Sequence, residues 1–539
     1  MRSRSIARRA ALGAACIALG ACMDLTVPNN NNPDRLRATS TPGDVEGLIA
    51  GTFQRYWPNV YGLTPTVMLS EMGYEFSTPF LCFGGQPNGM EPRPAWNNNS
   101  SYTYANVSST TWLNLYGVIS VVNDGLQALD RGVQIGPNGA NDSRARAFAK
   151  LMQGVAHGSL ALLWDKAVIV DEHTNVDTLV APRYAPSAEV MAAAIAMLKE
   201  SIAISDTASF VLPSTGWIPG LALTNKDLSR LAHTYIARFE AYEARSATER
   251  AAVNWADVLA QVNAGITSVR DDSTADFAPI GAPSVLSDSY KQVAARIRTV
   301  AGDYMRPSNW LVGPADSTDA WKNWVATPVA NRVAFQLRTK DRRIVGAASI
   351  TAPGLYTTYN PNIAFYNPTR GTYLQSKYYY TRYGAGTSYQ NGPLVAIGHT
   401  EMDMLEAEAL IRLNRASEAI PLINKTRVAN GQLPPVDING PPDEPGCVPR
   451  KTTGACGSLW DALRYEKRIE GMGIDGQVAF WDARGWNTLT VNSFIQFPIP
   501  GRELAIERLP NYTYGGGGPG SAPTPTWDAC PAGISLPRC

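Results

Sequence analysis

Histidine is scarce in this sequence, and neither sign of charge is in excess. Only four of the 539 residues are histidine, so the chain has little material for a histidine-centred metal site or a catalytic triad. It contains no Walker A phosphate loop, no G-x-S-x-G motif and no H-E-x-x-H motif. The 47 Lys and Arg nearly cancel the 46 Asp and Glu, which argues against nucleic acid as a partner, because nucleic acid requires a basic face.

One glycine motif does occur, the G-x-G-x-x-G pattern over Gly471–Gly476. A dinucleotide fingerprint follows a strand and opens a helix. This motif instead follows a predicted helix over 458–470, so we interpret it as a turn. We therefore predict neither a cofactor nor a metal site.

Beyond its first residues, the sequence lacks the run of about 18 apolar residues that a membrane-spanning helix needs. The apolar run Ala10–Ala21 follows four arginines and has the length of a signal-peptide core. It ends in Leu19-Gly20-Ala21-Cys22, which resembles a lipobox. We predict a signal peptide over 1–21, a lipid on Cys22, and a polar tether over 22–40. An ordinary secretory cleavage site is the alternative.

Cysteine is also sparse, and two of the seven cysteines fall in the N-terminal segment. Cys447 and Cys456, and likewise Cys530 and Cys539, form close pairs in loops rich in glycine and proline. Because an exported protein meets an oxidising compartment, we predict two disulfides and a free Cys82. A metal site is disfavoured, since the spacings are too long for C-x-x-C and no histidine is near.

Helical periodicity runs through much of the remaining chain. Several predicted helices come in pairs and carry small residues such as Gly154 and Ala237 on their faces, which is typical of tetratricopeptide-like repeats. Two long segments, 63–106 and 273–393, are instead irregular and rich in Gly, Pro, Asn and aromatic residues, which indicates functional loops. The predicted helices cover 44–57, 111–129, 144–164, 188–204, 226–244, 251–269, 401–413 (with Thr400 as its cap), 418–430 (with Pro421 in its first turn and Gly431 at its end) and 458–470.

The positive signal for ligand binding is aromatic. Nine of the 23 tyrosines lie between 356 and 389, and Trp96 stands beside three consecutive asparagines. Aromatic faces with nearby amides suit sugar rings, and they also suit peptides. The alternative is that most of these rings pack the loops onto the helices or pair short strands over 373–383. The residues that we expect to contact ligand are Trp96, Trp321 and Tyr359, followed by Tyr102 and Tyr379.

Several segments, taken in order, resemble the SusD/RagB family of outer-membrane nutrient-binding lipoproteins. The start after Cys22 and the segment Thr41–Gly51 resemble the family's opening and its first helix. The stretch Arg144–Asp165 resembles a later family helix, although the turn after it is altered to Asp165-Lys166-Ala167. The remaining matches are Glu401–Leu410 with Ala419–Arg427, then Tyr465–Arg468, Phe480–Trp486 and Phe497–Pro500 with Glu503-Leu504.

The resemblance implies a mainly α fold in which tetratricopeptide-like helix pairs form a right-handed superhelical body. One domain would cover 41–539, with a loop-rich ligand region over 273–393 and 63–106, a helix pair over 400–431 and a C-terminal motif region over 458–510. It also implies a lipid-anchored location on the outer membrane, facing the cell exterior, and a SusC-like TonB-dependent transporter as partner. It implies capture of a glycan or other oligomer, a peptide being the alternative ligand, and no catalysis.

Two other functions stay open from the residues alone. A lipid-anchored glycoside hydrolase needs only two well-placed carboxylates. A repeat scaffold that assembles envelope proteins would need no small ligand.

Overall fold

The computed structural model describes residues 39–78, 82–175, 184–266, 276–282, 285–291, 305–362, 372–382, 391–516 and 527–539. The predictions for the signal peptide, for Cys22, for most of the tether and for the Cys82 side chain lie outside this description. Among the helices of these ranges, none combines the length and the apolar character needed to cross a membrane.

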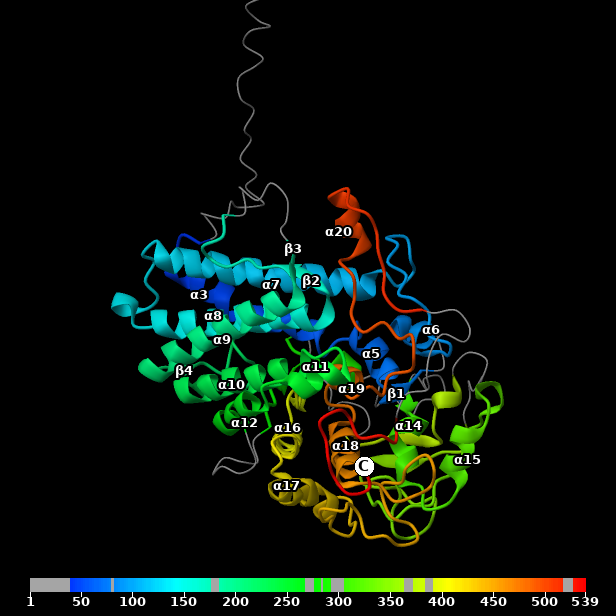
Figure 1. Cartoon of the computed structure of the whole chain (residues 1–539). Helices are drawn as coiled ribbons and strands as arrows, with labels where there is room; N and C mark the ends of the chain where they lie inside the picture. The colour runs from blue at the N-terminus through cyan, green and yellow to red at the C-terminus, as the bar shows by residue number, and fades with distance from the viewer. Residues whose placement is uncertain are drawn as a thin grey trace, which may run out of the picture.

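A stack of paired helices forms the body of the molecule, and successive helices pack on one another (Figure 1). The mainly α fold predicted from the sequence is therefore confirmed. The stack runs from the N-terminal helices through the long central ones to the C-terminal motif region. Its members are α3 (Pro42–Ala50), α4 (Thr52–Tyr56), α7 (Asn106–Asp130), α8 (Asp142–Leu163), α9 (Ser187–Thr207), α10 (Asn225–Tyr242), α12 (Trp255–Ala264), α16 (His399–Arg412), α17 (Ala416–Ala429) and α18 (Leu459–Gly471).

Small residues let these helices approach closely, as the sequence pattern indicates. A Cβ atom added at Gly154 of α8 would lie 2.7 Å from Cγ of Leu198 on α9. One turn later, a Cβ atom at Gly158 would lie 2.1 Å from Cε2 of Phe239 on α10. Both values are far inside van der Waals contact, so glycine allows α8 to pack against two neighbours at once.

Short helices and two-stranded sheets, joined by loops, lie outside this stack. They include α5 and α6 within 63–106, a region expected to be irregular. The short helices are α5 (Thr66–Met72), α6 (Gly85–Gly89), α11 (Ala247–Ala252), α14 (Asn309–Val312), α15 (Ala320–Ala326), α19 (Gly476–Gly485) and α20 (Gly501–Ile506). The antiparallel strand pairs are β1 (Phe76–Ser77) with β7 (Arg306–Pro307), β2 (Lys166–Val168) with β3 (Tyr184–Pro186), β4 (Val211–Leu212) with β5 (Leu223–Thr224), β6 (Ile280–Gly281) with β10 (Gly392–Pro393), and β8 (Thr357–Tyr359) with β9 (Tyr378–Tyr380).

Several predicted helix boundaries differ in the structure. The helix expected over 251–269 begins four residues earlier and is broken at Val253, whose extended ψ of 142° ends α11. The Asn254 side chain then accepts a hydrogen bond from the Asp257 amide and starts α12. Gly398, not Thr400, is the N-cap of α16. Because α17 begins at Ala416, Pro421 lies in its second turn and not in its first.

The G-x-G-x-x-G motif forms the predicted turn, but the turn is short. Gly473 has a φ of +74°, which favours glycine. The motif then ends in Gly476, which is the first residue of α19. The sequence pattern did not predict this helix. The motif connects two helices, and its Gly473 amide donates to the buried Glu75 carboxylate at 2.7 Å.

The segments that carry the family resemblance form buried charge networks between helices. Arg250 of α11 donates to Glu408 of α16 at 2.7 Å and to Asp482 of α19 at 3.2 Å, and Lys467 of α18 reaches the same Asp482 at 2.9 Å. Burial alone would raise the pKa of Glu408, but the Arg250 and Arg412 guanidinium groups outweigh it and hold that pKa far below its usual range. These motif residues therefore hold the helices together.

A second buried network joins α18 to the loop-rich part of the molecule. Arg343 is fully buried and bonds to Asp341 at 2.7 Å and to Glu470 at 2.9 Å, with Glu466 as a third partner. Arg427 of α17 approaches Glu466 at 3.4 Å. Three carboxylates thus surround two guanidinium groups. Removing any one of these five groups would leave a buried charge without its partner.

Candidate ligand-binding site

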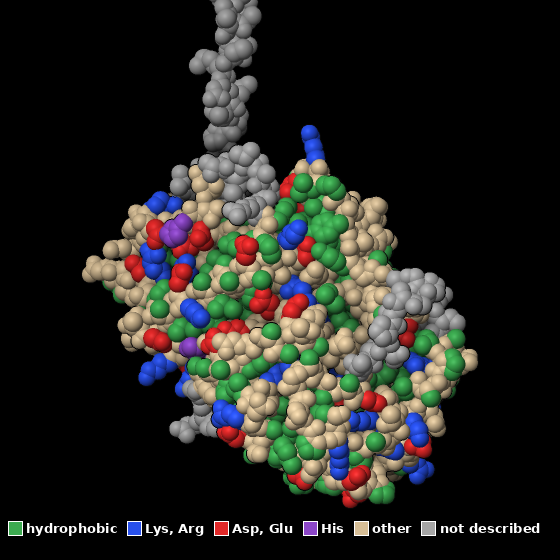
Figure 2. Space-filling view, in the orientation of Figure 1, with side chains coloured by type: hydrophobic (Ala, Val, Ile, Leu, Met, Phe, Trp, Pro, Cys, Tyr) green, Lys and Arg blue, Asp and Glu red, His purple; other side chains and the backbone are tan. Residues whose placement is uncertain are grey.

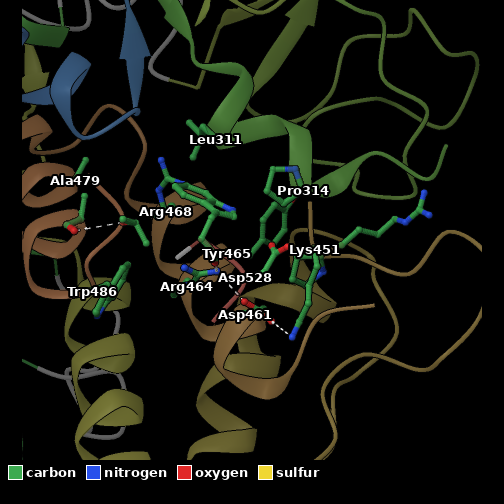
Figure 3. Close-up of a pocket in the computed structure, with 15 residues that line it drawn as sticks. Leu311, Pro314, Lys451, Asp461, Arg464, Tyr465, Arg468, Ala479, Trp486 and Asp528 are labelled. Atoms are coloured by element: carbon green, nitrogen blue, oxygen red, sulfur yellow. Dashed lines mark hydrogen bonds and ion pairs between the residues drawn. The ribbon is translucent and has the colours of Figure 1, made fainter. Parts of the chain in front are cut away.

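Two hollows in the described part of the chain have room for a small ligand, for which pockets of about 300–1,000 Å³ are typical. The first, about 300 Å³, is lined by residues 96–110 and 500–502; we call it the asparagine hollow. The second, about 490 Å³, is lined by residues 317–319 and 443–456; we call it the acidic hollow. Other cavities, such as the one in Figure 3, measure only about 30 Å³.

Amides and hydroxyls dominate the wall of the asparagine hollow. Two segments about 400 residues apart in sequence build it, the loop that leads into α7 and the start of α20, and Figure 1 places α20 beside that end of α7. Its lining residues are Trp96, Asn97, Asn98, Asn99, Ser100, Tyr102, Thr103, Ala105, Asn106, Ser108, Ser109, Thr110, Pro500, Gly501 and Arg502.

Asn98 fixes the two walls of this hollow to each other. Its side-chain amide donates to the Ile499 carbonyl at 2.9 Å and to Asn511 Oδ1 at 2.8 Å, and its Oδ1 accepts from the Gly501 amide at 3.1 Å. With every polar atom of its amide used and its side chain buried, Asn98 acts as a structural clamp. The exposed Asn97 and Asn99 beside it are open to solvent.

Trp96 and Tyr102, two predicted ligand residues, lie together here with different exposure. The Trp96 ring is only 1 % exposed and packs on Phe494 and Phe497, with centroids 5.6 and 4.9 Å away. The Tyr102 ring stands edge-on to Trp96 at 5.7 Å and is half-buried, and burial raises its pKa. Tyr102 therefore offers an aromatic surface to the hollow, whereas Trp96 supports it from behind.

Trp321 lies elsewhere, in an aromatic cluster of the loop-rich region. Its ring is 1 % exposed and is 6.3 Å from that of Trp310, which also contacts Trp324 at 5.8 Å and Trp527 at 4.6 Å. Gly313 faces it so closely that a Cβ atom there would lie 2.2 Å from Cδ1 of Trp321. Trp321 thus packs α15 against α14. It has the packing role that the sequence left open as the alternative to ligand contact.

Tyr359 and Tyr379 occupy a third place, the β8–β9 pair. They sit on paired strands, where Thr358 is the direct partner of Tyr379 and Tyr359 that of Tyr378. The Arg306 guanidinium lies 4.0 Å from the Tyr379 ring centre, and Asn360 donates to its hydroxyl at 3.1 Å. The five predicted ligand residues therefore fall in three separate places, and only Trp96 and Tyr102 share a hollow.

The three acidic residues that line the acidic hollow, Asp319, Asp443 and Glu444, are exposed and are already paired with cations. Lys340 bonds to Glu444 at 2.8 Å, Arg450 approaches Asp319 at 3.4 Å, and Arg538 approaches Asp443 at 3.7 Å. The Cys447–Cys456 disulfide borders it, and a second disulfide joins Cys530 to Cys539; these are the two pairs expected from their spacing. No group of three or more His, Cys, Asp or Glu suited to a metal ion occurs in the described ranges.

The cavity in Figure 3 lies between α18, α19 and the C-terminal segment. Arg464 donates to Asp461 at 2.7 Å and to the Trp527 carbonyl at 2.8 Å. Arg468 donates to the Tyr74 carbonyl at 2.9 Å, and burial lowers its pKa to about 10. A volume of about 30 Å³ accommodates only water. Arg464 holds the C-terminal segment through the Trp527 carbonyl, and the guanidinium groups of Arg464 and Arg468 both lie over the Trp527 ring.

No model of a protein family matches the sequence, and no curated protein matches it. Similarity appears among solved structures. A SusD superfamily protein from Bacteroides vulgatus ATCC 8482 is 13% identical, with 84% of this chain and 89% of that one covered and a TM-score of 0.52. A SusD-like protein from Bacteroides fragilis NCTC 9343 is 12% identical, with 85% and 89% covered and a TM-score of 0.52.

A SusD superfamily protein from Bacteroides thetaiotaomicron VPI-5482 is 12% identical, with 87% of this chain and 93% of that one covered and a TM-score of 0.51. The similarity thus extends over most of each chain. This chain therefore has the fold of the SusD superfamily, the fold that the sequence motifs imply.

Proposed function

We propose that this chain is a lipid-anchored binding protein of the outer-membrane surface, which captures a glycan or related oligomer and delivers it to a SusC-like TonB-dependent transporter. The observation that carries the ligand-binding part is the asparagine hollow. It combines a volume of about 300 Å³ with amides, hydroxyls and one half-buried tyrosine ring. Such a wall suits a sugar, whose hydroxyls pair with amides while a ring face lies on an aromatic side chain.

The composition of this wall supports binding over hydrolysis. Ordinary glycosidases use two carboxyl groups on either side of the scissile bond. The lining of the asparagine hollow, within the part of the chain that the structure describes, contains neither aspartate nor glutamate. A sugar held there would meet hydrogen-bonding groups but neither a carboxylic acid to protonate the leaving group nor a carboxylate to attack.

The anchor is the second part of the proposal. A lipid on Cys22 would hold the body through the tether, whose end at Thr39 is bonded to Arg131 just beyond the C-terminus of α7. The body over 41–539 would then act as one unit close to the membrane. Replacing Cys22 with Ala should move the protein from the membrane to the soluble fraction. If the variant still sediments with membranes, Cys22 is not the anchor.

The ligand is tested with the soluble chain from residue 23, screened against glycan and peptide libraries by thermal shift. A ligand that binds only the folded state raises the melting temperature. We expect a glycan to do so in the unmodified chain and in Tyr359→Ala, but not in Tyr102→Ala. Tyr359 serves as the matched control because it is also a half-buried tyrosine of a loop-rich region, but it lies on the β8–β9 strand pair, away from the hollow.

Loss of binding in Tyr359→Ala, with Tyr102→Ala unaffected, would place the site at the β8–β9 pair instead. Reducing-sugar release by the purified chain would contradict a purely binding role. Delivery is tested separately, by co-purification of the lipidated chain with a large β-barrel protein from the same cells. The absence of any such partner would contradict the transport part while leaving ligand binding intact.

A further inference from the structure

The asparagine hollow carries a single full charge, and that charge is positive. Among the described residues that line it, Arg502 is the only charged one. Elsewhere the chain is nearly neutral, and both signs of charge are scattered over the face shown in Figure 2. A hollow lined by neutral amides and hydroxyls, with one cation and no acid, favours a ligand that bears negative charge.

Arg502 is held beside the hollow by the backbone that precedes it. The preceding residue must be glycine, because a Cβ atom at Gly501 would lie 1.9 Å from the Asn98 carbonyl oxygen. The Gly501 amide donates to Asn98 Oδ1 at 3.1 Å, which clamps the start of α20 onto the opposite wall. The position of Arg502 relative to Tyr102 is therefore set by the fold, while its side chain is exposed.

The guanidinium of Arg502 is available to a ligand. Within the described ranges it forms no hydrogen bond and no ion pair within 4 Å. The acid that acts on it at longer range is Glu503, which does not line the hollow. By contrast, Arg464 and Arg468, which line the cavity in Figure 3, are bonded to protein groups. Arginine binds carboxylate and sulfate well because its fork of N–H groups matches two of their oxygens.

The first turn of α7 adds to this effect without carrying it. Asn106, Ser108 and Ser109 from that turn line the same hollow. The 25-residue helix has no acidic residue in its first turn and no side-chain cap. The first turn of α7 therefore brings no negative charge to the hollow, and the positive end of the helix dipole lies beside it.

On this basis, which rests on the proposed ligand-binding function, we propose that the hollow selects an anionic glycan and that Arg502 is the residue that selects it. The anionic group is a carboxylate, as in a uronic acid, or a sulfate ester. The neutral hydroxyls of the same sugar would pair with the amides of Asn97 and Asn99. A neutral glycan would fit the same walls but would gain nothing from the guanidinium.

The test measures calorimetric binding of two anionic probes, a galacturonic acid tetramer and a sulfated galactose tetramer, to the soluble chain from residue 23. The methyl ester of the galacturonic acid tetramer is the neutral counterpart. Arg502→Gln removes the charge but keeps a long polar side chain. Arg508→Gln is the matched control, since Arg508 is also exposed and close in sequence but does not line the hollow.

We expect at least one anionic probe to bind the unmodified chain and Arg508→Gln equally. Arg502→Gln should bind it about 10- to 100-fold more weakly, the range for losing a charge-assisted hydrogen bond. The neutral ester should bind the unmodified chain and Arg502→Gln alike, at the weaker level. Which of the two anionic probes binds tells whether the group is a carboxylate or a sulfate.

Two results separate this inference from the proposed function. If a neutral probe binds as tightly as an anionic one, or Arg502→Gln binds like the unmodified chain, while Tyr102→Ala abolishes binding, the hollow is a glycan site without charge selection and this inference is wrong. If no anionic probe binds, or if binding is indifferent to both Tyr102→Ala and Arg502→Gln, the hollow does not select an anionic glycan and this inference is wrong. The proposed capture of a glycan fails separately, when no glycan of the thermal-shift screen binds the chain.

Discussion

Replacing Gly158 with alanine should destabilise this chain, even though alanine is the better helix former. Gly158 lies inside α8, where a Cβ atom would be 2.1 Å from Cε2 and 2.4 Å from Cζ of Phe239. Phe239 has little freedom to move, because its ring is 3 % exposed and packs 5.9 Å from the ring of Tyr235. The added methyl group must therefore displace either the ring or the whole of α10.

The magnitude follows from two opposing terms. Helix propensity favours alanine over glycine by about 0.8–1 kcal/mol. Forcing an extra methyl group into a packed core costs about 1–3 kcal/mol. The upper part of that range applies, because a separation of 2.1 Å is more than 1 Å inside ordinary contact. We expect Gly158→Ala to lower the free energy of unfolding by about 1–2 kcal/mol.

The assay is equilibrium unfolding in urea of the soluble chain from residue 23. Gly47→Ala on α3 is the matched control, because a Cβ atom there meets no atom within 4 Å; it should raise stability by about 0.5–1 kcal/mol. Phe239→Leu replaces the obstructing ring with a smaller side chain. Gly158→Ala should therefore lower the free energy of unfolding less in that background than in the unmodified chain. Equal stability of Gly158→Ala and Gly47→Ala, or simple additivity with Phe239→Leu, would refute the close packing of α8 on α10.

Three further predictions concern buried groups and the disulfides. Burial raises the pKa of Glu71 to about 7, so the folded chain holds a proton that the unfolded chain releases near pH 4.5. As the pH rises from 4 to 8, the free energy of unfolding should therefore fall by about 3 kcal/mol relative to that of Glu71→Gln, as measured by urea titration. Replacing Arg250 with Met leaves the buried Glu408 without its strongest partner, and should cost about 3–5 kcal/mol in the same assay, a loss below 1 kcal/mol being incompatible with the network. Replacing both Cys447 and Cys456 with Ser opens a loop of nine residues' separation and should cost about 2–3 kcal/mol, whereas an unchanged urea midpoint would mean that the loop unfolds independently.

The sequence alone determined the helical body and the close cysteine pairs. Helices such as α7 and α18 are visible because apolar side chains recur every three or four residues, and a helix turns that spacing into one buried face. The break between α11 and α12 escaped this reasoning, since Val253 continues the apolar pattern while its backbone turns away. The pattern records which side chains are buried but not whether the backbone between them is continuous.

The candidate site could be predicted only in part. Trp96 and Tyr102 could be singled out because an aromatic pair beside three asparagines is visible in one short segment, and both line the hollow. Arg502 could not be found, since the opposite wall of the hollow lies about 400 residues away. The sequence also did not show which aromatic rings are buried. Trp96 and Trp321 were both expected to contact ligand, but both are only 1 % exposed.

The N-terminal segment, the helices and the segments that resemble a known family could thus be predicted from local signals. Each of them depends on residues that are neighbours in the chain. Tertiary structure decided which aromatic rings reach the surface, which motif residues form buried ion pairs, and where a hollow opens. Exposure and cavity shape arise from contacts such as that of Asn98 with Gly501, between residues 403 apart. No pattern within a single segment contains that information, because the free energy of burying a side chain depends on the partner that covers it.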